Sequence, residues 1–135
     1  MLNEFLNQVC EWAANEPRIG AVALIGSYAR GAQRPDSDVD LILITSDKQS
    51  FIDDPEVFRA FGEIERYEIE DYGECTSIRV RYRSGLEVEF GMVPYKWIEM
   101  PLNKGTERCL DGGCRILMDK KGLFEPISAI IPELI

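Results

Sequence analysis

Two short apolar runs, joined by a polar segment from Gly26 to Asp40, constrain the fold of this chain more than any other feature. The first run is Ile19–Ile25 and the second lies within Val39–Thr45, and nearly every residue in both is apolar. Continuous apolar strands are typical of the centre of a sheet, where both faces are covered. We therefore expect two central strands, connected by a turn and one short helical segment over Ser27–Ala32.

The polar segment places two acidic side chains at the start of the second strand. Asp38 and Asp40 are separated by one residue, so in an extended strand both carboxylates point to the same face. Neighbouring carboxylates repel each other unless a cation lies between them, and a divalent hard cation with oxygen ligands meets this need. At the other end, the Gly26-Ser27 turn offers backbone N–H groups and a hydroxyl group that suit an anion such as phosphate.

The remaining pattern predicts a single α/β domain over residues 1–135. We expect a mixed sheet of about five strands, with helices packed on one side and the carboxylates at one end of the sheet. Apolar residues recur at helical spacing in an N-terminal helix of about fourteen residues that ends before Pro17. A short helix is expected over Pro55–Phe61, and Ile64–Ile69 is expected to form a weaker strand.

Two alternating segments predict a β-hairpin around Ser84-Gly85. A two-residue loop would place Tyr82 opposite Glu87 and mix the two faces of the hairpin. A three-residue loop with Gly85 at the positive-φ position keeps the faces separate, so we expect this register. Its facing pairs are Tyr82–Leu86, Val80–Val88, Arg81–Glu87 and Arg79–Glu89.

After Pro94 the chain is expected to cover the sheet rather than build it. The pattern predicts one helical turn over Tyr95–Ile98, a short helix capped by Thr106 and an edge strand over Cys114–Met118. The tail is too apolar to remain in water, so it should pack on this chain or on a second copy. Its apolar residues are Ile127, Ile130, Ile131, Leu134 and Ile135.

Composition excludes several classes of function. The net charge of −9, from 24 acidic and 15 basic residues, argues against a broad surface for polymeric nucleic acid. The chain has no histidine, which excludes Ser-His-Asp hydrolases, Cys-His hydrolases and His-ligated metal sites. The cysteines lack a usual zinc spacing, the N-terminus is not that of a secretory signal and no apolar run is long enough to span a membrane. We therefore expect reduced thiols in a cytoplasmic protein.

A combined motif runs through the chain: Gly26-Ser27, then Asp38-x-Asp40, then an acidic residue between apolar ones in Val88-Glu89-Phe90. This motif resembles the DNA polymerase beta-like nucleotidyltransferase superfamily. The residues around it are similar to the small bacterial branch, which includes aminoglycoside-type adenylyltransferases and minimal nucleotidyltransferases. The resemblance covers roughly residues 1–93, which would be the catalytic core. Residues 94–135 would then be a covering segment that also offers a contact for a homodimer.

The resemblance implies transfer of a nucleoside monophosphate from a nucleoside triphosphate to a hydroxyl group of a small-molecule acceptor, with release of pyrophosphate. ATP is the expected donor, so AMP is the group transferred. The catalytic residues implied are Asp38, Asp40 and Glu89, which would hold two magnesium ions at the two ends of an in-line displacement.

The resemblance also implies a set of nucleotide-binding residues, namely Gly26, Ser27, Arg30 and Ser37. Gly26 would let the backbone approach the phosphates, and the Ser27 hydroxyl would hold the β- or γ-phosphate. Arg30 and Ser37 are further candidates for phosphate contacts.

The third carboxylate stays open between two glutamates. The superfamily most often has an aspartate at this position, whereas this chain has Glu87 and Glu89 on one strand face. Glu89 fits better because it follows the turn at the distance seen in the resembling enzymes. Arg79 and Arg81 are either contacts for a substrate anion or ion-pair partners of these glutamates.

The acceptor also stays open. Larger members of the superfamily add a helical acceptor domain after the third carboxylate, and the residues after Glu89 do not suggest one. The alternative to a small-molecule acceptor is therefore an antitoxin-like or regulatory protein that binds a separate helical partner protein, or transfers AMP to it. A nucleotide-binding domain that has lost catalysis is a third hypothesis.

Overall fold

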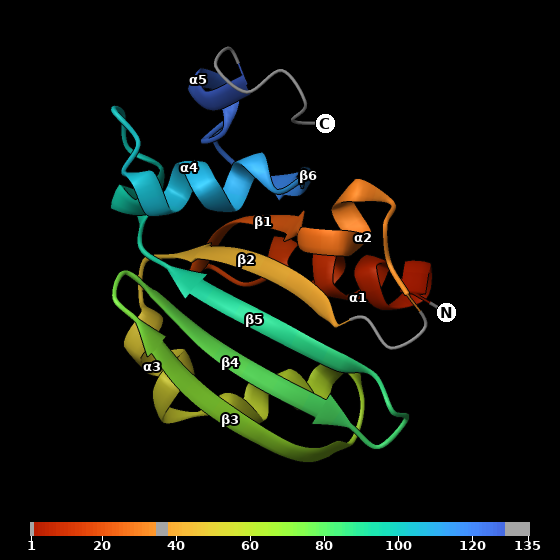
Figure 1. Cartoon of the computed structure of the whole chain (residues 1–135). Helices are drawn as coiled ribbons and strands as arrows, with labels where there is room; N and C mark the ends of the chain where they lie inside the picture. Colours follow the sequence, from red (N-terminus) through yellow and green to blue (C-terminus); the bar gives the residue numbers. More distant parts are fainter. Residues whose placement is uncertain (1, 35–37, 129–135) are drawn as a thin grey trace.

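A six-stranded mixed sheet forms the centre of the computed structural model, which describes residues 2–34 and 38–128 (Figure 1). The predicted α/β class is confirmed, with six strands among these residues rather than about five. The strands, in the order β3-β4-β5-β2-β1-β6, are β1 (Ile19–Ile25), β2 (Val39–Thr45), β3 (Ile64–Tyr72), β4 (Cys75–Tyr82), β5 (Glu87–Val93) and β6 (Cys114–Asp119). The helices are α1 (Leu2–Ala14), α2 (Gly26–Arg30), α3 (Lys48–Asp53), α4 (Lys104–Asp111) and α5 (Glu125–Ser128), with 3-10 helices η1 (Pro55–Phe61) and η2 (Tyr95–Ile98).

The two apolar runs form the neighbouring central strands β1 and β2, as predicted, and these strands pair antiparallel. β2 pairs in parallel with β5, whereas the other strand pairs are antiparallel. The connection from β2 to β5 passes through α3, η1, β3 and β4. Because β2 and β5 run in the same direction, their first residues lie at the same end of the sheet.

Side chains along β1 and β2 alternate between two apolar clusters on opposite faces of the sheet. On one face, Leu24 and Leu41 join a cluster that α1, α3 and η1 cover. On the other face, Ala23 and Ile42 join a cluster that η2, α4 and α5 cover. Helices therefore cover both faces rather than one side, because the segment after Pro94 supplies the apolar residues for the second layer.

The hairpin between β4 and β5 has the predicted register. Val80 faces Val88, and the backbone N–H of Tyr82 donates to the carbonyl oxygen of Leu86 at 2.9 Å. Gly85 has φ of +97°, the positive value that the three-residue loop requires. The register also places Arg79 beside Glu89, which brings β4 into the site described below.

Two local features differ from the prediction. Asn103, rather than Thr106, caps α4, because the Asn103 side chain accepts a hydrogen bond from the backbone N–H of Thr106 at 2.8 Å. The buried Thr106 hydroxyl instead donates to the carbonyl oxygen of Trp97 at 2.7 Å. Helix α3 was not expected, since its six residues bury only Phe51 and carry no helical apolar repeat.

The C-terminal segment and the thiols follow the prediction where the structure describes them. Strand β6 lies at the edge of the sheet, and Ile127 of α5 is fully buried. The four cysteines are free thiols. Ile130, Ile131, Leu134 and Ile135 lie outside the described residues. No helix within residues 2–34 and 38–128 is long and apolar enough to cross a membrane.

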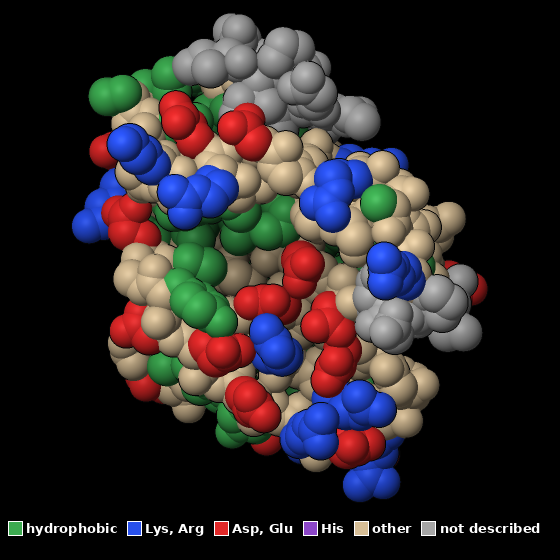
Figure 2. Space-filling model, in the orientation of Figure 1, with side chains coloured by type: hydrophobic (Ala, Val, Ile, Leu, Met, Phe, Trp, Pro, Cys, Tyr) green, Lys and Arg blue, Asp and Glu red, His purple; other side chains and the backbone are tan. Residues whose placement is uncertain are grey.

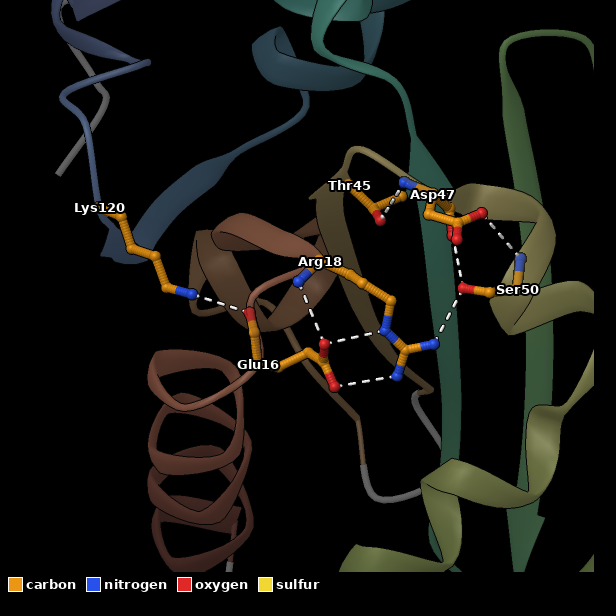
Figure 3. Close-up of polar contacts among 6 residues, drawn as sticks. All are labelled: Glu16, Arg18, Thr45, Asp47, Ser50 and Lys120. Atoms are coloured by element: carbon orange, nitrogen blue, oxygen red, sulfur yellow. Dashed lines mark hydrogen bonds and ion pairs between the residues drawn. The ribbon is translucent and has the colours of Figure 1, made fainter.

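A polar network holds the end of the β1–β2 pair that lies far from the acidic motif (Figure 3). The Arg18 guanidinium donates to both carboxylate oxygens of Glu16, at 2.8 and 2.9 Å. It also donates to the Ser50 hydroxyl at 2.9 Å, and Ser50 donates in turn to the carbonyl oxygen of Asp47 at 2.8 Å. This network ties the start of β1 to α3.

Candidate active site

The parallel pairing of β2 and β5 builds the centre of the candidate site. Asp40 of β2 faces Glu89 of β5, and on its other side Asp40 faces Ile25, the last residue of β1. Gly26 follows Ile25 directly and begins α2. The sheet therefore brings the predicted Gly26 turn and two of the predicted acidic residues to one place.

Gly26 is required here by the carboxylate of Asp40. Its φ is +76°, a conformation that residues with a Cβ rarely adopt. A Cβ atom at this position would lie 2.6 Å from Oδ2 of Asp40. Any larger residue would therefore strain the backbone and displace the carboxylate.

Asp40 and Glu89 face each other across β2 and β5 and form an inner pair of carboxyl groups. Burial, and next the negative charge of Glu89, raise the pKa of Asp40 to about 7. Glu89 is also held from β4: the Ser77 hydroxyl donates to its Oε1 at 2.7 Å, and Nη2 of Arg79 lies 3.5 Å from its Oε2. Because like charges this close repel each other, a cation bound between the two carboxylates would relieve the repulsion.

Asp38 and Glu87 form an outer pair at the edge of the same site. Burial, and next a hydrogen bond with Glu87, raise the pKa of Asp38. The same hydrogen bond lowers the pKa of Glu87, and the nearby Arg81 guanidinium lowers it further. The two candidates for the third carboxylate thus occupy different places, with Glu89 beside Asp40 and Glu87 beside Asp38.

The arginines of β4 are ion-pair partners of the glutamates, one of the two roles that the sequence allowed. Nη2 of Arg79 lies 3.5 Å from Oε1 of Glu70 and equally far from Oε2 of Glu89. Nη1 of Arg81 lies 3.5 Å from Oε1 of Glu87. Figure 2 shows acidic and basic side chains interleaved on this face of the molecule, where β3–β5 lie in Figure 1.

The other nucleotide-binding candidates lie on or near α2. Ser27 is half-buried and follows Gly26 on this helix. Arg30 is exposed, and its Nη1 donates to the carbonyl oxygen of Gly112 at 2.5 Å. This contact ties α2 to the C-terminal end of α4, so the Arg30 guanidinium already has a partner within the chain. Ser37 lies outside the described residues.

The donor set of the inner pair fits a hard divalent cation. Its ligands are carboxylate oxygens, which magnesium prefers, and Asp40 faces Glu89 across the β2–β5 pairing, so that both carboxylates could contact one cation. Among residues 2–34 and 38–128, no three acidic or thiol side chains converge on one point as they stand. Asp38 would join the inner pair only after its carboxylate turns away from Glu87.

Two features of the site were not predicted from the sequence. Ser77 lies on the strand face that carries Arg79 and Glu89, and the alternation along β4 was the available signal for it. A cavity of about 460 Å3 also lies on this face, between the sheet and α4, with Ile42 and Trp97 in its lining. Because Ile42 follows Asp40 by two residues in β2, the cavity opens on the sheet face that carries Asp40.

Comparisons with known proteins agree with the resemblance that the sequence suggested. The model of the streptomycin adenylyltransferase family matches residues 1–132. No curated protein matches the chain in sequence.

Solved structures share the fold. An aminoglycoside 6-adenyltransferase from Bacillus subtilis aligns with a TM-score of 0.56 and 18% identity, over 70% of this chain and 35% of that one. The polymerase core of TRAMP, an RNA surveillance complex, aligns with a TM-score of 0.52 and 14% identity, over 66% of this chain and 29% of that one. The chain thus spans about a third of the length of these proteins.

Proposed function

Because the chain belongs to the streptomycin adenylyltransferase family, we propose that it transfers AMP from ATP to a hydroxyl group of a small molecule, with release of pyrophosphate. In this reaction the acceptor oxygen bonds to the α-phosphorus of ATP while the bond from that phosphorus to the bridging oxygen of the β-phosphate breaks. The hydroxyl proton passes to a carboxylate of the inner pair.

The observation that carries the proposal is the inner pair, Asp40 and Glu89, held against the Gly26 turn. Together with Asp38, these carboxylates would hold two magnesium ions. When bound, the metal would neutralise the charge of the phosphates and favour ionisation of the acceptor hydroxyl. The backbone at Gly26 and the hydroxyl of Ser27 would orient the β- and γ-phosphates next to these carboxylates. The continuous pairing of β2 with β5 would hold the carboxylates of Asp40 and Glu89 in place before substrate binds.

The cavity on the sheet face of the inner pair supports a small-molecule acceptor. Its volume of about 460 Å3 lies within the range of small-ligand pockets. The described residues that line it include no lysine or arginine, and the carboxylate of Glu74 is paired with Lys96 at 3.7 Å, so the lining offers no free positive charge for an anionic acceptor.

The test is to incubate the protein with magnesium and each nucleoside triphosphate, labelled at the α-phosphate. The reactions are run alone, with streptomycin and other aminoglycosides, and with cell extract. We expect pyrophosphate release and a labelled small molecule, with ATP as the preferred donor. Asp40→Asn serves as the inactive control. A labelled protein band in the extract reaction would instead identify a partner protein as the acceptor. Failure of every triphosphate to bind in the presence of magnesium would refute the enzymatic function.

A further inference from the structure

Both carboxylate oxygens of Glu89 are contacted by side chains of β4. The Ser77 hydroxyl donates to Oε1 at 2.7 Å, a short and therefore strong hydrogen bond to an acidic group. Arg79 approaches Oε2 at 3.5 Å, but the same Nη2 atom is shared with Glu70 at an equal distance. Ser77 is thus the tighter and more directional of the two contacts.

The burial of Ser77 distinguishes it from an ordinary strand serine. It is 1% exposed, and a buried hydroxyl group is costly unless it is hydrogen-bonded. Two other buried hydroxyls bond to the backbone: Thr106 donates to the carbonyl oxygen of Trp97, and Thr45 accepts from the N–H of Asp47. Ser77 instead directs its hydrogen bond to a carboxylate of the site.

We propose that Ser77 is a positioning residue that holds the Glu89 carboxylate in the orientation in which it can bind a cation together with Asp40. This inference rests on the proposed function, in which Glu89 is a metal ligand. Glutamate has one more rotatable bond than the aspartate that is commonest at this position in the superfamily, so its carboxylate needs an additional restraint. The Ser77 hydroxyl supplies that restraint.

A hydroxyl group suits this task because it is neutral. It fixes Oε1 of Glu89 without adding positive charge that would repel a cation, whereas Arg79 adds such charge on the opposite oxygen. Removing a group that hydrogen-bonds to a metal ligand and orients it commonly lowers metal affinity or activity 10–100-fold.

The experiment measures binding of Mn2+ by electron paramagnetic resonance, with and without ATP, together with transfer activity. Ser77→Ala should weaken Mn2+ binding by about 10–100-fold and lower kcat more than it raises KM for ATP. Ser77→Thr keeps the hydroxyl and should recover most of the affinity. Thr76→Val is the matched control: Thr76 directly precedes Ser77 in β4, is 5% exposed, and points to the opposite face. It should leave Mn2+ binding unchanged.

A double-mutant cycle with Glu89→Asp separates positioning from a general structural effect. The aspartate side chain is one methylene group shorter and should lose the hydrogen bond to Ser77, so Ser77→Ala should cost little further affinity in the Glu89→Asp background. Equal losses in both backgrounds, or unchanged Mn2+ affinity in Ser77→Ala, would overturn the inference. Absence of Mn2+ binding in the wild-type protein would instead overturn the proposed function itself.

Discussion

The two ends of the β1–β2 pair both carry half-buried acidic groups, but their surroundings are opposite. At the start of β1, Glu16 accepts two hydrogen bonds from the Arg18 guanidinium and one from the Arg18 backbone N–H, and the pKa of Glu16 is lowered to about 2. At the other end, Asp40 faces Glu89, and burial together with the negative charge of Glu89 raises the pKa of Asp40 to about 7.

The acidic charge at the Glu16 end is balanced by the chain itself, whereas the acidic charge at the Asp40 end needs a bound cation to balance it. The Glu16 end is neutralised by the chain itself, so it stabilises the fold. The Asp40 end gathers acidic groups that repel each other when ionised, and Arg79 alone does not balance them. Such an arrangement costs stability and persists at sites that bind something from solution. It therefore supports a cation site at this end of the strands.

The largest expected effect comes from removing charge at each end separately. The double variant Asp38→Asn with Asp40→Asn should weaken binding of Mn2+ and ATP by about a thousandfold, because it removes two of the proposed metal ligands. Its stability in EDTA should be unchanged or slightly higher, since the repulsion is relieved. Glu16→Gln should leave binding unchanged and lower the free energy of unfolding by about 1–2 kcal/mol. Calorimetric titration and urea unfolding measure these two quantities.

Two outcomes would contradict this difference between the two ends. If the double variant failed to fold, the two aspartates would be structural residues like Glu16. If Glu16→Gln lost affinity for ATP, the two ends would be coupled through β1 and β2 rather than independent.

A smaller effect is expected from Gly26→Ala, which disturbs the Asp40 end without changing any charge. The new Cβ would meet the Asp40 carboxylate, so we expect at least about a tenfold loss of Mn2+ affinity, together with about 1 kcal/mol of stability lost to backbone strain. Gly31→Ala is the matched control, because Gly31 has a similar φ of +70° but no atom within 4 Å of the Cβ position. It should lose similar stability and keep Mn2+ binding. Equal Mn2+ affinities in the two variants would show that backbone strain alone, and not the contact with Asp40, is the reason that position 26 requires glycine.

Much of the fold could be predicted because its signals are local. The apolar runs of β1 and β2 and the alternation in β4 and β5 identify strands from adjacent residues, and they were enough to set the hairpin register. Helix α3 was missed because it buries only Phe51. The second helical layer was missed because a sequence pattern shows that a face is apolar but not which sheet face it covers.

The candidate site depends on pairings that are distant in sequence. The contact of Asp40 with Glu89 requires β2 and β5 to pair in parallel, which no local pattern indicates, so the sequence reached this pair only through the family resemblance. The contact of Ser77 with Glu89 lies within the β4–β5 hairpin, whose register was predicted, so the alternation along β4 could have indicated it. The cavity beside Ile42 depends on how α4 packs on the sheet, which no local pattern shows. The metal and nucleotide roles of these residues stay predictions.

The smallest expected effect is in the pH dependence of stability, where the two ends should have opposite signs. The pKa of Asp40 is raised from 3.8 to about 7, so the folded state binds more protons than the unfolded state between these values. The free energy of unfolding in EDTA should therefore fall as the pH rises from about 4 to 7. The pKa of Glu16 is lowered from 4.5 to about 2, so its contribution is lost as the pH falls through that range.

Thermal unfolding in EDTA across pH 3 to 8 measures both slopes, each expected to shift Tm by about 2–5 °C. In Asp40→Asn, the fall of Tm above pH 4 should disappear, while the loss of Tm below pH 4 should remain. In Glu16→Gln, the loss of Tm below pH 4 should become smaller, while the fall above pH 4 should remain. With saturating Mn2+, the Tm of the wild-type protein should rise with pH above pH 4, because the cation binds the ionised carboxylates. If Tm in EDTA still falls above pH 4 in Asp40→Asn, the titrating group is not Asp40. The proposed electrostatic difference between the two ends of the strands would then be wrong.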